Sequence, residues 1–348
     1  ISIEDIIPNE QVVITISNAG YIKRTSVNEY KTQARGGVGQ KASATRDKDF
    51  IEHLFIGTNH QYMLFFTEKG KCFWLRVYEI PEGGKNTKGR AIQNLINIAP
   101  DDLVKAVICT HDLKEQDYIN SHYVIMATKK GIIKKTCLEQ YSRPRQNGIV
   151  AITIKEDDEL LEARLTSGNS QVMLAVKSGK AIRFPEEKVR AVGRSGSGVR
   201  GISFDDEAND EVIGMITIEN PKEETVLVVS ENGYGKRTFI DDPETGEAVY
   251  RITNRGGKGV KTISVTEKTG NLVAIKSVLE EDDLMIINKS GMAIRLPVSD
   301  LRVMGRATQG VRLINIKGND SIAAVAKVMK EDEEFTEGED TEEPSTNE

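Results

Sequence analysis

The stretch TVLVVSENGYGKRTFIDDP, residues 225–243, joins an apolar run to a run of mixed basic and apolar residues through a polar turn that ends in glycine. The first run contains Thr and Val, and the second contains Tyr, Thr and Phe, which are residue types that favour β-strands. The turn Glu231-Asn232-Gly233 is typical of a hairpin, because Gly and Asn adopt positive φ readily. The stretch therefore predicts a β-hairpin.

The same pattern occurs six times along the chain. Its copies begin at Val12, Tyr62, Tyr123, Gln171, Thr225 and Asp283. The turn of each copy ends in a glycine, and these are Gly20, Gly70, Gly131, Gly179, Gly233 and Gly291. A second glycine follows each turn, and these are Gly39, Gly89, Gly148, Gly198, Gly259 and Gly310. A recurrence of this kind indicates six repeats of one structural unit.

Two further strands complete each repeat. An apolar strand follows the second glycine, as in GVKTISV from Gly259, and a turn then leads to a strand such as VIGMITI from Val212. Helical periodicity is hard to find, and no linker rich in Pro or Ser separates the repeats. We therefore predict an all-β fold, a ring of six four-stranded blades that is either closed or spiral, because such a ring leaves only short strand edges exposed.

Length and composition are those of a folded protein. The chain has 348 residues, of which 38% are apolar, so it can bury a substantial core. No apolar run approaches the roughly 18 residues that cross a bilayer. The N-terminus lacks both an initiator Met and the basic start of a signal peptide, so we expect a soluble piece of a longer protein. We expect Cys72, Cys109 and Cys137 to be buried thiols.

Charge divides the chain into two parts. Residues 331–348 contain ten acidic side chains and no basic one, while residues 1–330 carry 47 basic and 43 acidic side chains. The acidic segment holds too little apolar surface to offset the entropy of ordering, which predicts a disordered tail. We therefore predict one folded domain over residues 1–330, mildly basic, and an acidic tail over residues 331–348.

Two loops of the chain share an Arg-Gly-Gly sequence. They are TQARGGVGQK, residues 32–41, and TNRGGKGVKT, residues 253–262, and both lie just before the third strand of a repeat. Paired glycines let backbone amides approach a ligand closely, and the flanking bases supply positive charge, which together suit a phosphate group. The alternative is that the sequence only forms a tight turn.

Basic residues gather in the second hairpin strand and in the loop that follows it, whereas acidic residues gather in the turns between repeats. Repetition around a ring would collect these bases into one track, the basic rim. We predict that the rim contains Lys23, Arg24, Lys88, Arg90, Lys134, Lys135, Arg143, Arg145, Arg183, Arg194, Arg200, Lys236, Arg237, Arg295, Arg306 and Arg312. Such a track favours binding of duplex DNA through its phosphates, independently of sequence. The alternative is that these bases only solvate exposed strands.

The six repeats, the opening IEDIIPNEQVVITISNAGYIKR, the Gln-x-Arg-Gly-Gly-x-Gly loop and the stretch ENGYGKRT resemble the C-terminal domain of bacterial DNA gyrase A. The resemblance covers residues 1 to about 330. It implies a six-bladed β-pinwheel in which neighbouring blades exchange a strand. It also implies that the domain wraps DNA around its rim with a positive crossing, which enables negative supercoiling by an ATP-dependent type IIA topoisomerase.

The resemblance assigns the first Arg-Gly-Gly loop as the signature box of the family. The matching residues are Gln33, Arg35, Gly36, Gly37 and Gly39, with Lys41 beyond them. Ala34 and Val38 stand where the family has bases, so we expect Lys41 and Arg46 to compensate. We expect a second loop to share DNA binding, and its residues are Arg255, Gly256, Gly257, Lys258 and Gly259.

The resemblance also implies partners. They are duplex DNA, the remainder of gyrase A, and gyrase B in an A2B2 holoenzyme, located in the bacterial cytoplasm with the nucleoid. The isolated domain is expected to be monomeric and to contact no membrane. The acidic tail is expected to compete with DNA for the rim. A related possibility is the equivalent domain of topoisomerase IV, which typically has fewer blades and a degraded box.

Catalytic motifs are not evident in the sequence. Each Gly-Lys pair lacks the Ser or Thr that follows it in a phosphate-binding P-loop, and the four histidines show no metal-ligand spacing. We therefore expect a non-enzymatic chain without metal or cofactor, and the resemblance places the cleavage tyrosine, the ATPase and their ATP and Mg²⁺ in other parts of the holoenzyme. A propeller that binds proteins is the remaining alternative, but only 5% of the residues are aromatic.

Overall fold

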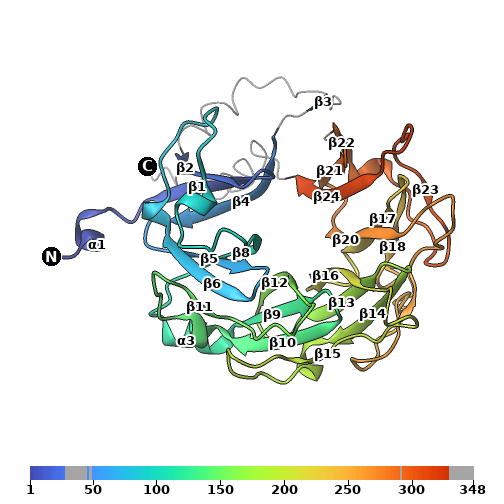
Figure 1. Ribbon diagram of the computed structural model, residues 1–348, viewed down its shortest axis with the longest axis horizontal. Helices are drawn as coiled ribbons and strands as arrows, with labels where there is room; N and C mark the ends of the chain where they lie inside the picture. Colours follow the sequence, from blue (N-terminus) through green and yellow to red (C-terminus); the bar gives the residue numbers. More distant parts are fainter. Residues whose placement is uncertain (28–44, 47–48, 291, 329–348) are drawn as a thin grey trace, which may run out of the picture.

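The computed structural model describes residues 1–27, 45–46, 49–290 and 292–328. Their strands form six four-stranded antiparallel sheets, the blades, which follow one another around a ring (Figure 1). This confirms the predicted all-β ring of six blades. The predicted box residues Gln33, Arg35, Gly36, Gly37, Gly39 and Lys41 and the predicted tail, residues 331–348, lie outside the described residues.

Every blade has the same strand order, from the ring centre outward. Blade 1 contains β4 (Ile51–Thr58), β1 (Gln11–Ser17), β2 (Tyr21–Ser26) and β7 (Arg90–Ala91). Blade 2 contains β8 (Val104–Thr110), β5 (Tyr62–Thr67), β6 (Lys71–Arg76) and β11 (Ile149–Val150). Blade 3 contains β12 (Leu160–Thr166), β9 (Tyr123–Thr128), β10 (Ile132–Cys137) and β15 (Val199–Arg200).

The other three blades repeat this order. Blade 4 contains β16 (Val212–Ile218), β13 (Gln171–Val176), β14 (Lys180–Pro185) and β19 (Val260–Lys261). Blade 5 contains β20 (Leu272–Val278), β17 (Thr225–Ser230), β18 (Tyr234–Phe239) and β23 (Val311–Arg312). Blade 6 contains β24 (Ile322–Val328), β21 (Asp283–Asn288), β22 (Met292–Pro297) and β3 (Thr45–Arg46).

The outermost strand of each blade comes from the next repeat. In blade 4, for example, β19 pairs with β14 although it follows the hairpin of repeat 5. The exchange also closes the ring, because β3 of repeat 1 pairs with β22 of repeat 6, with Met292 opposite Arg46 and Ala293 opposite Thr45. Each blade is therefore completed by its neighbour.

Helices are few and short in the described part of the chain. Two are α-helical, α1 (Ile3–Ile6) and α3 (Gln116–Ser121). The others are single 3₁₀ turns, and they are η1 (Val77–Glu79), η2 (Ile92–Asn94), η3 (Leu138–Tyr141), η4 (Glu186–Lys188) and η5 (Val298–Asp300). Among the described residues, no helix is long and apolar enough to cross a membrane.

Hydrophobic cores lie between neighbouring blades. Between blades 2 and 3, Phe66 and Leu64 pack with Val124, Met126 and the buried ring of Tyr141. Burial of these side chains removes apolar surface from water and so stabilises the contact between successive sheets. Cys72 is fully buried, as predicted, whereas Cys109 and Cys137 are only partly buried. Burial raises the pKa of Cys109 to about 12, as expected for an unreactive thiol.

The structure explains why the second recurring position of the repeat pattern, as at Gly259, is a glycine. Gly259 has a φ of +75°, and a Cβ atom there would lie 2.3 Å from the carbonyl oxygen of Ala181. The outer strand thus meets the hairpin of the preceding repeat too closely for a side chain. The turn glycine Gly233 has a φ of +92°, which confirms the predicted hairpin turn.

Candidate nucleic-acid interface

Five loops of the described chain follow the hairpins and end at the second glycine. These rim loops are residues 84–89, 143–148, 193–198, 254–259 and 305–310. Each leads into the short outer strand of the preceding blade and rests on the chain of the preceding repeat. In the loop of repeat 5, Gly256 donates from its amide to the Gly201 carbonyl at 2.8 Å and accepts from the Ser203 hydroxyl at 2.7 Å. The rim loops are thereby connected from one repeat to the next.

An arginine in three rim loops strengthens this connection. It stands four residues before the second glycine, and its Nη1 atom donates to a carbonyl oxygen two residues after the second glycine of the preceding repeat. The pairs are Arg194 with Val150 (2.8 Å), Arg255 with Arg200 (3.2 Å) and Arg306 with Lys261 (2.7 Å). Arg35 has the same position in repeat 1 and lies outside the described residues.

Many of the predicted bases lie at least partly on the surface, in these loops or in the strands that adjoin them. Those that are exposed are Lys88, Arg90, Arg143, Arg145, Arg200, Arg255, Lys258 and Arg312. Those that are half-buried are Arg24, Arg194, Arg295 and Arg306. Further exposed bases beside the rim loops were not among the predicted site residues, and they include Arg190, Arg251, Lys261 and Arg302. Arg190, Arg251 and Arg302 each stand eight residues before a second glycine. Alignment of the repeats could therefore have identified them as equivalent basic positions.

Six predicted rim bases are buried, in contrast to the expected exposed track. They are Lys23, Lys134, Lys135, Arg183, Lys236 and Arg237. Three of them form ion pairs, and these are Lys135 with Glu186 (3.2 Å), Arg183 with Asp241 (2.7 Å) and Arg237 with Glu280 (2.6 Å). Buried charges need such partners. Most bases of the second hairpin strand are therefore buried and bind partners within the protein. The exposed positive charge lies mainly in and beside the rim loops.

The Arg-Gly-Gly loop of repeat 5 carries two exposed bases. Arg255 donates from Nε to the Lys188 carbonyl at 3.1 Å, in addition to its contact with Arg200. Lys258 forms an ion pair of 3.0 Å with Asp205, which also pairs with Lys180 at 2.6 Å. Hydrogen bonds from Lys180 and then Lys258 lower the pKa of Asp205, so this carboxylate stays charged and offsets part of the positive charge of the loop.

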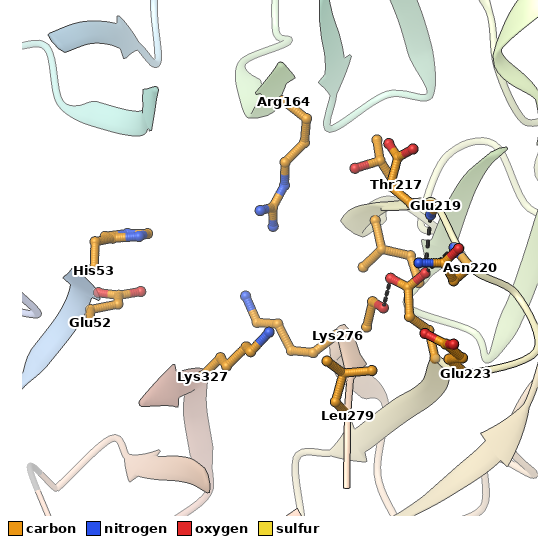
Figure 2. A pocket seen from close by; sticks show the side chains of 13 residues that line it. Glu52, His53, Arg164, Thr217, Glu219, Asn220, Glu223, Lys276, Leu279 and Lys327 are labelled. Carbon is orange, nitrogen blue, oxygen red and sulfur yellow. Dashed lines mark hydrogen bonds between the residues drawn. The ribbon is translucent and has the colours of Figure 1, made fainter. Parts of the chain in front are cut away.

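The centre of the ring contains a second charged region, a cavity of about 440 Å³. Figure 2 shows Arg164, Lys276 and Lys327 pointing into it from three blades, with Glu52 and His53 on the side opposite Glu219 and Asn220. The carboxylates Glu219, Glu223 and Glu224 also line it. Burial lowers the pKa of both His53 and Lys276. Because the cavity mixes both signs of charge, it suits a phosphate chain less well than the rim does.

Metal binding has no evident site in the described part of the chain. Those residues contain no group of three or more His, Cys, Asp or Glu side chains that could hold a metal ion. The fold and the rim together define a class of protein: a propeller-like ring of strand-exchanged blades, whose exposed bases recur in equivalent loops along the outer edge.

Comparison with known proteins identifies the family within that class. The family model described as "DNA gyrase C-terminal domain, beta-propeller" matches residues 11–57, 61–111, 122–167, 171–219, 224–242, 245–278 and 282–329. The chain therefore belongs to the DNA gyrase C-terminal domain family, which confirms the resemblance drawn from the repeats.

Relatives and solved structures agree with this membership. The chain is 43% identical over 343 residues to DNA gyrase A of Staphylococcus aureus strain NCTC 8325, covering 99% of this chain and 37% of that protein. The chain thus spans about a third of the length of the curated relatives it matches. A crystal structure of a topoisomerase IV C-terminal domain is similar in fold, with a TM-score of 0.80, 23% identity and coverage of 95% of this chain and 98% of that chain. A gyrase A C-terminal domain structure matches with a TM-score of 0.66, 25% identity and coverage of 92% and 100%.

Proposed function

We propose that this chain binds duplex DNA along its rim loops, independently of base sequence, and wraps it with a positive crossing. The observation that carries this proposal is the recurrence of exposed bases at equivalent positions of successive repeats, just before the rim loops, as at Arg190, Arg251 and Arg302. Bases spaced along a curved edge can contact successive phosphates of one duplex.

Wrapping requires several blades to act together. Bending a site of 20–30 base pairs costs on the order of 1–6 kcal/mol by elastic estimates. A single loop with two or three bases supplies few phosphate contacts, whereas loops on several blades bound to one duplex offset that cost. The contact of each such rim loop with the outer strand that follows the preceding loop, such as Arg306 with Lys261, keeps successive loops in fixed relative positions.

Within the parent enzyme, this wrapping would direct negative supercoiling by an ATP-dependent type IIA topoisomerase. The partners that we propose are the rest of gyrase A, together with gyrase B, in an A2B2 complex on the bacterial nucleoid. Cleavage of DNA and hydrolysis of ATP, with their Mg²⁺, would take place in those partners, and this chain would contribute DNA geometry only.

A second candidate is the function of a topoisomerase IV-like domain, which binds DNA segments without strong wrapping. The observation that favours it is the replacement of two box bases by Ala34 and Val38. The fold does not separate the two candidates, because the chain is similar to solved domains of both kinds. They differ in the change in DNA linking number that the bound protein causes when a nicked plasmid is closed.

The test is to incubate the chain with nicked circular plasmid, ligate the nick, remove the protein and measure the linking number on a gel. A positive shift that grows with protein concentration supports gyrase-like wrapping. Binding without a shift supports the topoisomerase IV-like function. Failure to bind duplex DNA at low salt contradicts both and would leave a protein-binding propeller.

A further inference from the structure

A buried lysine lies beneath the rim loop of repeat 6. Lys236, the third residue of β18, is 1% exposed. Its Nζ atom donates to the carbonyl oxygens of Gly305 (2.6 Å), Arg306 (2.6 Å) and Thr308 (2.8 Å). An ammonium group has three N–H donors, so these three carbonyls satisfy it completely without a carboxylate. We call this arrangement the carbonyl cage.

The carbonyl cage occurs again in repeat 2. Lys23, the third residue of β2, donates from Nζ to the carbonyls of Gly84 (3.2 Å), Lys85 (2.5 Å) and Thr87 (2.7 Å). These carbonyls stand five, four and two residues before Gly89, as those around Lys236 do before Gly310. Lys134 has a related contact in repeat 4, where it donates to the carbonyls of Arg194 and Ala151. Two independent loops thus share one main-chain conformation around an ammonium group.

Caged loops alternate with loops that have no ammonium. At the strand position of these lysines, blade 2 has Phe73 and blade 4 has Ile182. A Cβ added to Gly257 would lie 3.6 Å from the Cδ1 atom of Ile182, so an apolar side chain underlies the Arg-Gly-Gly loop of repeat 5. That loop has no carbonyl cage beneath it.

The cage determines where the loop amides point. In a trans peptide the carbonyl and the amide of one peptide unit point in opposite directions, and the described chain has no cis peptide. Because the carbonyls of Arg306 and Thr308 face Nζ, the amides of Ala307 and Gln309 point away from the interior. Among the described residues neither amide has an acceptor. Outward amides beside a base form a site for an anionic oxygen.

We propose that Lys23 and Lys236 are positioning residues for DNA binding, which hold the rim loops of repeats 2 and 6 so that main-chain amides of each loop face a DNA phosphate. This inference rests on the proposed function of the rim. Lys134 contacts the loop of repeat 4 through one carbonyl, that of Arg194. The lysines contact the loop from inside and do not contact DNA.

The test compares Lys236→Ala with Ile182→Ala, which shortens the side chain at the equivalent position of blade 4 without removing an ammonium. Affinity for a fluorescent duplex is measured by anisotropy across a salt series. The experiment is done at neutral pH, because burial and the neighbouring Arg306 lower the pKa of Lys236 to about 8 and the side chain is protonated below that pH.

We expect Lys236→Ala to weaken binding roughly tenfold, because three buried carbonyls lose their donor and the loop rearranges. The slope of log K against log salt should stay that of the unsubstituted chain, because no phosphate contact of a side chain is removed. Millimolar n-propylammonium, which places an ammonium in the vacated cage, should restore affinity. Tetramethylammonium, which has no N–H donor, should not, and Ile182→Ala should respond to neither amine.

Other outcomes overturn the proposal. A slope lowered by about one unit would mean that Lys236 contacts a phosphate directly. Unchanged affinity, or loss without rescue by n-propylammonium, would mean that the cage does not position the loop for DNA. If Lys236→Ala does not fold, the unsubstituted chain provides the test through the NMR signals of the Ala307 and Gln309 amides. The proposal predicts that these signals shift when duplex is added. Signals that stay unchanged would contradict it. If the unsubstituted chain fails to bind DNA, the proposed function itself fails.

Discussion

At the scale of single residues, exposure decides which bases are available to DNA. Lys135 and Arg183 are buried in ion pairs, whereas Arg255 and Lys258 are exposed in a rim loop. A strand that carries bases on a half-buried blade can direct them inward, and they then bind carbonyls or carboxylates of the next repeat. The exposed positive charge is therefore in and beside the rim loops, although Arg255 and Lys258 also contact the Arg200 carbonyl and Asp205 there.

Replacing Arg255 and Lys258 together by Ala should weaken DNA wrapping at least as much as Arg35→Ala does. Both bases are exposed in the loop of repeat 5, so their removal should also lower the salt dependence of binding by up to about two units. Wrapping is measured by plasmid ligation and salt dependence by anisotropy. Lys114→Ala with Lys222→Ala is the matched control, because it removes the same charge at exposed positions outside the rim loops. An unaltered linking-number shift in the Arg255 and Lys258 variant would contradict the assignment.

At the scale of the element, glycine allows each outer strand to approach the hairpin with which it pairs. The outer strand can approach the preceding hairpin only where the residue before it has no side chain, as at Gly259. Among the described residues the same close approach recurs at Gly89, Gly148, Gly198 and Gly310, which is why a glycine at this position is so evident in the sequence.

Gly259→Ala should lower the free energy of unfolding by about 2 kcal/mol or more, because alanine at a φ of +75° is strained and its Cβ would overlap the Ala181 carbonyl. Urea unfolding followed by circular dichroism measures this change. Gly305→Ala is the control, since a Cβ there meets nothing within 4 Å and the backbone is not in the positive-φ region. Equal stability of the two variants would show that the close approach is not required.

Much of the fold could be predicted because its signals are short in range. Turn residues such as Asn232-Gly233, the second glycines and the apolar runs can all be recognised within one repeat, so six blades follow from the sequence. Burial of Lys236 could not be predicted, because the carbonyls that bind it belong to a loop 69 or more residues further along the chain. The same reason applies to Arg183, whose partner Asp241 is 58 residues away. A base on a strand has the same sequence pattern whether it faces solvent or the next repeat.

At the scale of the whole molecule, charge separates into an outer and an inner zone. The rim loops expose bases such as Arg145 and Lys258, while the central cavity balances Lys276 and Arg164 against Glu52 and Glu219. A polyanion therefore gains most by following the outer edge of the ring, which is the path that wrapping requires.

Deleting residues 331–348 should raise the affinity for duplex DNA. The segment carries ten acidic side chains and is tethered to the domain, so its effective concentration near the rim is high and it competes with phosphates. Anisotropy at low and high salt measures the change, which should shrink as salt screens both interactions. A variant that replaces the ten acids by Gln and Asn controls for chain length. Unchanged affinity after deletion would show that the segment has no such role.

Strand exchange restricts how a protein of this kind can change its size during evolution. Because each hairpin accepts the outer strand of whichever repeat follows it, duplication or loss of one whole repeat leaves every hairpin edge covered. Loss of part of a repeat would instead leave one edge uncovered, and an open edge invites pairing with another copy of the chain. Blade number is thus free to vary by whole repeats, and the pairing of β3 with β22 lets the first repeat complete the last blade.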